Sequence, residues 1–131
     1  MPNDGFDLRT SATPVSFLYV ADRQQALDFY CGPLGLELRS SDRFGDFIEN
    51  GPGLIRMTVI PERQPAQHPV LGWNIPDIRW SVEALRARRV EFILYEGMGQ
   101  DELGIWNSPD GSAKVAFFAD PDGNVLSLAE V

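Results

Sequence analysis

The sequence predicts an α+β fold in which two tandem βαβββ modules form a curved mixed sheet around a cup. Three observations predict it. Short apolar runs at 15–22 and 70–77 each end in an aspartate and repeat at an offset of 55 positions. An amphipathic helix pattern follows each run, and three strand-like segments follow each helix. Because one such module leaves an apolar sheet face uncovered, the repeat implies that the two halves pair.

The first module is expected over about residues 13–62, after a tail over residues 1–12. Its opening run is apolar at successive positions, a pattern typical of a strand covered on both faces. Asp22 then suits a helix N-cap, where its carboxylate accepts from free backbone amides, and a helix is predicted over 23–31. Turn residues separate the strands that follow. These strands are predicted at 36–40, 47–50 and 54–60.

The second module is expected over about residues 69–131, after a polar linker. Asp77 suits the cap of a second helix, predicted over 78–88, and its terminal arginines suit a helix C-terminus. This half carries about 15 extra residues, mostly within 96–112, an insertion that is rich in glycine and contains Trp106. Trp73 and Trp80 are expected in the core. The strands of this half are predicted at 91–95, 113–119 and 125–131.

Composition excludes several classes of function. The 131 residues suit one domain, and a net charge of −8 without a basic stripe argues against nucleic-acid binding. No apolar run approaches the roughly 18 residues that a membrane span needs, and the N-terminus lacks a secretory pattern, so a cytoplasmic protein is expected. The single cysteine, Cys31, permits neither an internal disulfide nor a thiolate metal cluster.

Three segments carry a resemblance to a known family. Residues 20–38 begin Val-Ala-Asp-Arg-Gln-Gln-Ala-Leu-Asp-Phe-Tyr, residues 74–92 open the second module, and residues 116–128 contain Asp-Pro-Asp-Gly-Asn before a closing strand. In this order the segments resemble the vicinal oxygen chelate superfamily, the fold of glyoxalase I, bleomycin-resistance proteins and extradiol dioxygenases. The resemblance covers about residues 13–131. It implies the cup-shaped fold more specifically than any one function.

The resemblance also implies where a metal is expected. Active members hold one divalent metal with His, Gln or Glu on the first and fourth strands of each module. The matching positions in this chain are Val15, Arg56, Val70 and Ser127. Valine has no lone pair to offer, and the arginine cation repels a metal. We therefore expect no metal and no other cofactor in the cup.

A displaced metal site is an alternative that the residues leave open. His68 is the only histidine, and it lies in the linker between the modules. A shifted site would combine His68 with Glu62 or Glu96. A solvent-exposed loop histidine is the simpler interpretation.

Strand alternation predicts the lining of a small-molecule pocket. Side chains two positions apart share a sheet face, and the resulting set combines apolar walls with a few polar groups. The predicted ligand-binding residues are Phe17, Tyr19, Arg56, Thr58, Asn74, Trp106 and Ser127. Alternatively, side chains simply fill the cup, Arg56 pairs with a nearby carboxylate, and Trp106 anchors its loop rather than covering a ligand.

Two classes of function fit these observations. The first is a metal-free, bleomycin-resistance-like protein that binds a small organic molecule, with sequestration or resistance as its role. The second is a vicinal oxygen chelate enzyme, a lyase, isomerase or dioxygenase, acting without metal or with a metal at another position. The sequence identifies no catalytic residues. A homodimer is expected, because two open sheets leave edges and apolar flanks to cover.

Overall fold

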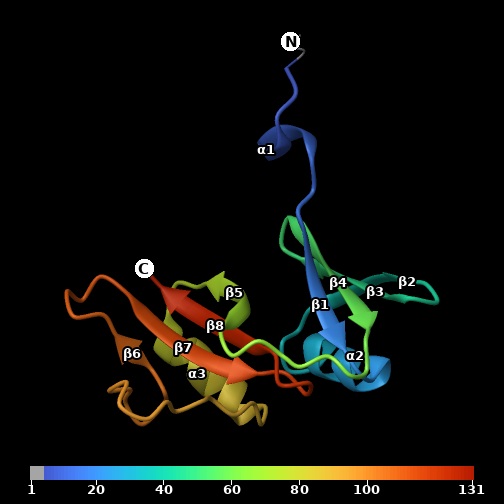
Figure 1. Ribbon diagram of the computed structural model, residues 1–131. Coiled ribbons are helices and arrows are strands. Elements are labelled where there is room, and N and C mark those ends of the chain that lie inside the picture. The colour runs from blue at the N-terminus through green and yellow to red at the C-terminus, as the bar shows by residue number, and fades with distance from the viewer. Residues whose placement is uncertain (1–4) are drawn as a thin grey trace.

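The computed structural model describes residues 5–131 and contains two four-stranded sheets, one from each half of the chain (Figure 1). The first half contains β1 (Val15–Val20), α2 (Arg23–Cys31), β2 (Glu37–Ser41), β3 (Gly45–Asn50) and β4 (Gly53–Val59). The second half contains β5 (Pro69–Asn74), α3 (Ile78–Ala87), β6 (Trp106–Asn107), β7 (Lys114–Ala119) and β8 (Val125–Glu130).

The two sheets share one topology, which confirms the predicted tandem modules. Sheet A has the strand order β1-β4-β3-β2 and sheet B the order β5-β8-β7-β6. In sheet A, β1 lies parallel to β4, and in sheet B, β5 lies parallel to β8. The remaining neighbouring strands are antiparallel. The registers also match, because Phe17 pairs with Arg56 in sheet A and Gly72 pairs with Ser127 in sheet B. An irregularity between Pro69 and Leu71 interrupts this correspondence at the start of β5.

The helices begin where the capping aspartates predict. The Asp22 carboxylate accepts a hydrogen bond of 3.0 Å from the Gln25 amide, and Asp77 accepts one of 3.0 Å from the Trp80 amide. Each bond satisfies an amide that has no partner within its helix. At the other end of α3, Arg89 adopts a φ of 69°, the left-handed conformation that commonly ends a helix and that glycine adopts most easily.

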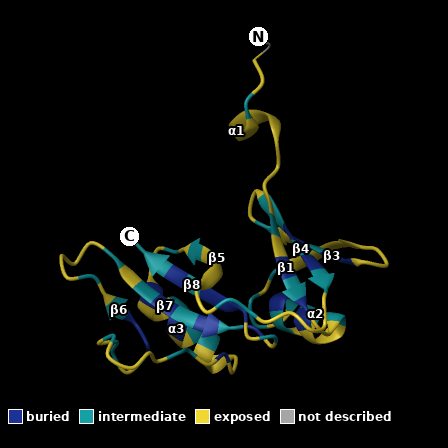
Figure 2. Ribbon diagram, viewed as in Figure 1, coloured by how far each residue is buried: buried dark blue, intermediate teal, exposed yellow. Residues whose placement is uncertain are grey.

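The core lies on the helix-covered face of each sheet (Figure 2). In sheet A this face carries Leu18 and Ile55, and in sheet B it carries Phe118 and Leu126, all nearly inaccessible to solvent. Trp80 was expected in this core, but 70% of its surface is exposed. The expectation was wrong because α3 buries the side of Ile78 and Val82 and turns Trp80 away from them.

The strand predicted at 91–95 does not form. Phe92 makes a single bridge to Phe118, and β6, inside the insertion, occupies the edge of sheet B instead. The side chain of Gln100 explains the difference. It accepts from the Tyr95 amide at 2.6 Å and donates to the Ile93 carbonyl at 2.9 Å, so it binds backbone groups that a strand ladder needs.

The two modules are joined by a buried polar network. The Tyr30 hydroxyl, on α2, donates a hydrogen bond of 2.6 Å to Asp120 in the turn before β8. Asn124, in the same turn, donates to Asp120 at 2.8 Å and to the carbonyl of Tyr19 on β1 at 3.1 Å. The Asp-Pro-Asp-Gly-Asn turn, which carried part of the resemblance, therefore connects sheet B to both β1 and α2.

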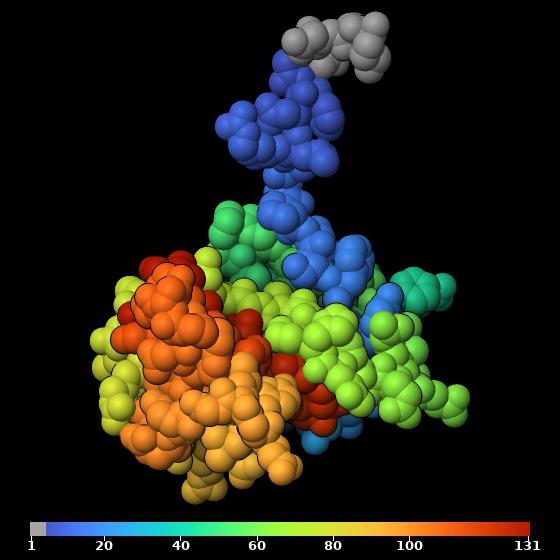
Figure 3. Space-filling model, turned by 60° about the vertical axis from the view of Figure 1, so that its left-hand side comes forward, coloured from blue at the N-terminus to red at the C-terminus, as the bar shows by residue number. Residues whose placement is uncertain are grey.

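The tail before β1 extends away from both sheets. Residues 1–4 of the predicted tail lie outside the described residues. The remainder forms α1 (Leu8–Ser11), capped by Asp7, whose carboxylate accepts from the Thr10 amide at 2.8 Å. Figures 1 and 3 show this segment standing clear of the body. Within residues 5–131, no helix combines the length and the apolar character that crossing a membrane requires.

Candidate functional site

The face of sheet A that α2 leaves uncovered carries a row of three large side chains. Phe17 on β1 pairs with Arg56 on β4, which pairs in turn with Phe47 on β3. Because paired residues in neighbouring strands share a face, these side chains lie together, opposite the buried Leu18 and Ile55. Phe17 is 67% exposed, so its ring is open to a ligand or to another protein surface.

Arg56 occupies the centre of this row and is tied to Asp42. Its Nη1 and Nη2 atoms each donate a hydrogen bond of 3.1 Å to one oxygen of the Asp42 carboxylate. These bonds, with those from the Phe44 and Gly45 amides, lower the pKa of Asp42 to about 2. The alternative that Arg56 pairs with a nearby carboxylate is confirmed, and its positive charge is compensated.

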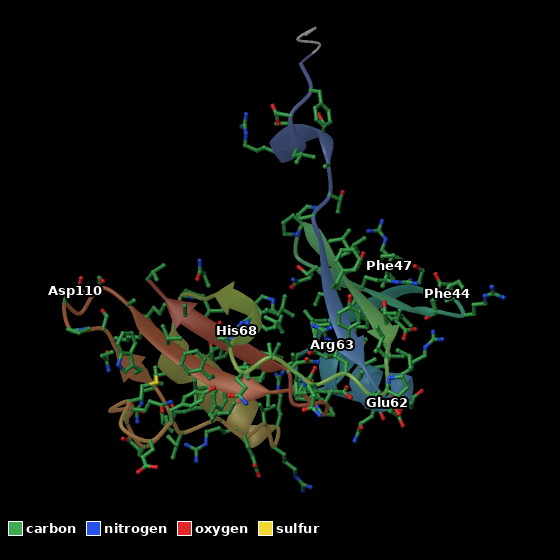
Figure 4. The ribbon with its side chains drawn as sticks, in the orientation of Figure 1. Phe44, Phe47, Glu62, Arg63, His68 and Asp110 are labelled. Carbon is green, nitrogen blue, oxygen red and sulfur yellow. The ribbon has the colours of Figure 1, made fainter. Side chains whose placement is uncertain are left out.

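Three arginines stack on aromatic rings of the first module. The guanidinium carbon of Arg63 lies 4.4 Å from the centroid of the Tyr19 ring. Arg56 lies 4.6 Å from the centroid of Phe47. Arg43 and Phe44 form a third pair, at 4.8 Å, in the turn between β2 and β3. Figure 4 shows Arg63 reaching this module from the linker. Such contacts hold the rings in place. Among residues 5–131, no arginine or lysine stacks on the Phe17 ring.

The corresponding face of sheet B carries glycine and serine at its centre. Gly72 pairs with Ser127, and Ser127 pairs with Phe117. A side chain on Gly72 would collide with the Ser127 hydroxyl, so glycine is what lets Ser127 lie on this face. Tyr95 packs edge-on against Phe117 with ring centroids 5.5 Å apart. Small residues therefore lie at the centre of this face, with an aromatic pair beside them.

The structure divides the predicted pocket residues between the two sheets. Four of them share the open face of sheet A, and the other three belong to the second module. Trp106 lies in β6, paired with Val115 and only partly exposed, so it anchors the insertion to sheet B. Asn74, at the end of β5, borders a crevice on the helix side of the fold. The four on sheet A are Phe17, Tyr19, Arg56 and Thr58.

Sequence reasoning missed three residues of this face. Phe47 shares the row with Arg56, and the alternation of β3 carried a signal for it. Asp42 precedes the strand that pairs with β4, and Arg63 lies in the linker. Neither carried a sequence signal, because only the folded hairpin and the path of the linker bring them to Arg56 and Tyr19.

The donor groups in this region do not fit a divalent metal. Val15 and Val70 offer only hydrocarbon, Ser127 offers a neutral hydroxyl, and Arg56 is a cation already bound to Asp42. Within residues 5–131, no group of three or more His, Cys, Asp or Glu side chains lies close enough to hold a metal ion. The described donor groups therefore support no catalytic step through a metal.

The displaced metal site around His68 is not assembled either. His68 is exposed, and its Nδ1 lies 3.2 Å from the Pro69 carbonyl oxygen. Figure 4 shows His68 and Glu62 toward opposite ends of the linker. Within the described residues, His68 is therefore an exposed loop residue.

Comparisons with solved structures support the fold. A glyoxalase family protein from Enterococcus faecalis superposes with a TM-score of 0.73 at 16% identity, covering 93% of this chain and 99% of that one. A genomically encoded fosfomycin resistance protein from Listeria monocytogenes gives 0.72 at 15% identity, covering 92% and 93%. Lactoylglutathione lyase from Agrobacterium tumefaciens gives 0.66 at 20% identity, covering 92% and 93%. At these sequence identities, the similarity shows a shared fold and does not show a shared activity.

The family itself is established by sequence. Among curated proteins, none matches this chain. The family profile described as Glyoxalase/Bleomycin resistance protein/Dioxygenase superfamily matches residues 12–128, which span both modules and the linker. The chain therefore belongs to the glyoxalase, bleomycin resistance protein and dioxygenase superfamily.

Proposed function

We propose that this protein binds a small organic molecule without a metal and acts by sequestration, as a bleomycin-resistance-like member of its superfamily. One observation carries the proposal: the positions that hold the family's metal ligands contain Val15, Val70, Ser127 and an arginine bound to Asp42. Such a set supplies no anionic or imidazole ligand for a metal. It does supply apolar surface with a few polar groups, which suits an organic ligand.

The open face of sheet A is the wall that the ligand contacts in this proposal. Phe17 presents an aromatic ring with 67% of its surface exposed, and ring stacking is an effective contact with flat organic molecules. Thr58 and Tyr19 provide polar groups on the same face. Because Asp42 compensates Arg56, the attraction depends more on the shape of the ligand and its apolar area than on its negative charge.

A second copy of the chain completes the cup in this proposal. β1 and β5 are edge strands of separate sheets, and edge strands leave backbone groups unpaired. Exposed apolar side chains, among them Phe17 and Val70, lie on or beside these edges. A homodimer that brings sheet A of one protomer to sheet B of its partner buries these groups and closes a pocket. Sedimentation as a monomer at micromolar concentration contradicts this part of the proposal.

Metal analysis followed by ligand screening tests the function. We expect protein purified without chelators to contain well below one equivalent of zinc, nickel, iron or manganese per chain. Thermal-shift screening against metabolites and antibiotics is then expected to find a ligand that raises the melting temperature. Calorimetry should give the same Kd with and without EDTA, and mass spectrometry should recover the ligand unchanged.

The same measurements identify the enzymatic alternative. About one metal per chain, together with ligand binding that is lost on chelation, contradicts the metal-free proposal. Conversion of the ligand to a product by metal-free protein contradicts sequestration and favours an enzyme that works without metal.

A further inference from the structure

We propose that a crevice between the two modules, on the helix side of the fold, is a second binding site that takes a small planar aromatic acid. Its volume is about 340 Å³, within the range of small-molecule pockets. Phe118 and Leu128, both buried beneath the helices, contribute to its lining. The crevice is separate from the open face of sheet A, so this inference does not depend on the proposed function.

The crevice is formed by elements from both modules. One wall is a stripe on α3 with Trp80 and Ala84, which lie four residues apart and therefore on one helix face, and Arg88 is the C-cap residue that follows the helix. Pro33 and Leu34, which follow α2, also line the crevice. A molecule bound here contacts both halves of the chain at once.

Two tryptophans suit the crevice to a flat ring. The Trp73 indole N–H donates a hydrogen bond of 2.7 Å to the Asn50 side chain, so this indole is fixed beside the cavity. Trp80 is 70% exposed, and its indole N–H has no partner within residues 5–131. An exposed tryptophan beside a cavity gains apolar contact when an aromatic ring packs against it.

The charge of the crevice favours an acid. The chain carries 19 acidic residues and a net charge of −8, yet no Asp or Glu among residues 5–131 lines this crevice. Arg88 is the one charged residue among those described that line it, and it donates a hydrogen bond of 2.9 Å to the Pro33 carbonyl. Within the described part of the chain, no carboxylate pairs with Arg88. The remaining guanidinium donors can bind a carboxylate, as arginine commonly does.

Nuclear magnetic resonance of the three tryptophan side chains tests this site directly. Trp73 and Trp80 line the crevice, whereas Trp106 lies on sheet B outside it. We expect titration with 1-naphthoate to shift the indole signals of Trp73 and Trp80 saturably and to leave that of Trp106 in place. The neutral analogue 1-naphthalenemethanol should bind the same site more weakly.

Two arginine variants separate specific recognition from general charge attraction. Arg88→Gln should weaken 1-naphthoate by about 5- to 10-fold, the effect of losing one charge-assisted contact at a partly exposed site. It should leave 1-naphthalenemethanol unchanged. Arg86→Gln removes the same charge two residues away, from a side chain that does not line the crevice, and should leave both affinities unchanged. Ala84→Phe, which fills the cavity, should abolish binding of both probes.

Three results contradict the proposal. Equal weakening by Arg86→Gln and Arg88→Gln shows that binding follows net charge alone. The absence of a saturable shift at millimolar 1-naphthoate shows that the crevice does not take an aromatic acid. A Trp80 signal that moves on dilution of the protein alone shows that another copy of the chain covers the crevice. Melting temperatures of all variants verify that each remains folded.

Discussion

The Arg56 guanidinium donates two hydrogen bonds of 3.1 Å, one from each Nη atom, to the two oxygens of the Asp42 carboxylate. The pair spans the open face of the first module, between the turn after β2 and the centre of β4. A cation that would repel a metal is thus compensated by a carboxylate from its own sheet. This arrangement explains how an arginine occupies the face at little electrostatic cost.

Asp42→Asn should make stability less dependent on acid pH. The pKa of Asp42 is lowered to about 2, first by the Arg56 hydrogen bond and then by the Phe44 amide. Because the folded pKa lies below the unfolded one, the contribution to stability is present above about pH 4 and is lost as pH falls toward 2. Melting temperatures should therefore differ between variant and parent at pH 6 and converge near pH 2. Glu96→Gln, at an exposed loop carboxylate, is the control and should keep the pH profile of the parent protein.

Phe17→Ala should affect binding without affecting folding. Phe17 is 67% exposed, whereas the adjacent Leu18 is 2% exposed. Urea denaturation should show a change within about 0.5 kcal/mol for Phe17→Ala and a loss of about 2–5 kcal/mol for Leu18→Ala. A ligand found in the screen should bind Phe17→Ala more weakly. Unchanged affinity for that ligand excludes Phe17 from the site.

Tyr30→Phe should destabilise the junction between the modules. The change removes the hydroxyl that donates at 2.6 Å to Asp120, while both residues are buried. Leaving a buried carboxylate short of a donor costs about 1–3 kcal/mol, which urea denaturation measures. Tyr95→Phe, at a partly exposed ring outside the junction, should have little effect. Equal losses from both changes contradict a special role for the Tyr30 hydroxyl.

The parent protein should lose stability as pH rises and Asp122 ionises, and Asp122→Asn should not show this loss. Burial, and then the nearby charges of Asp120 and Asp22, raise the pKa of Asp122, although its hydrogen bond from the Ala21 amide opposes the shift. Its Oδ2 atom is buried and has no partner within residues 5–131. Because the folded pKa exceeds the unfolded one, this contribution to stability is present below about pH 4 and declines as pH rises through the folded value.

The measurement compares melting temperatures from pH 4 to pH 7. The melting temperature of Asp122→Asn should rise relative to that of the parent protein as pH increases across this range, because the amide does not ionise. Glu96→Gln, at an exposed loop carboxylate, should follow the parent. A parallel pH profile for Asp122→Asn contradicts the assignment.

Arg89→Gly should stabilise the end of α3. Arg89 has a φ of 69°, and a left-handed conformation costs a residue with a Cβ atom roughly 1–2 kcal/mol. Glycine avoids that cost but loses more entropy on folding, so we expect a net gain of about 0.5–1 kcal/mol in urea denaturation. Arg86→Gly, inside the helix, should instead lose about 1 kcal/mol. A loss at both positions contradicts the argument from backbone conformation.

The sequence by itself determined the modular fold and the residues that replace the family's metal ligands. Local signals suffice for these features: Asp22 and Asp77 cap helices through their own next turn, and residue type alone decides whether Val15 and Val70 can donate to a metal.

The tertiary structure decided which faces are buried and what each polar group meets. Gln100 displaces the strand predicted at 91–95. Trp80 was expected in the core and is exposed, because α3 buries its opposite side. Asp42 neutralises Arg56, and Trp73, Trp80 and Arg88 meet the loop after α2 to form the crevice. The Gln100 partners lie five and seven residues away in a loop, but the Asp42–Arg56 pair and the crevice join residues more distant in sequence. Only the packing of sheets and helices brings such residues within hydrogen-bond or van der Waals distance.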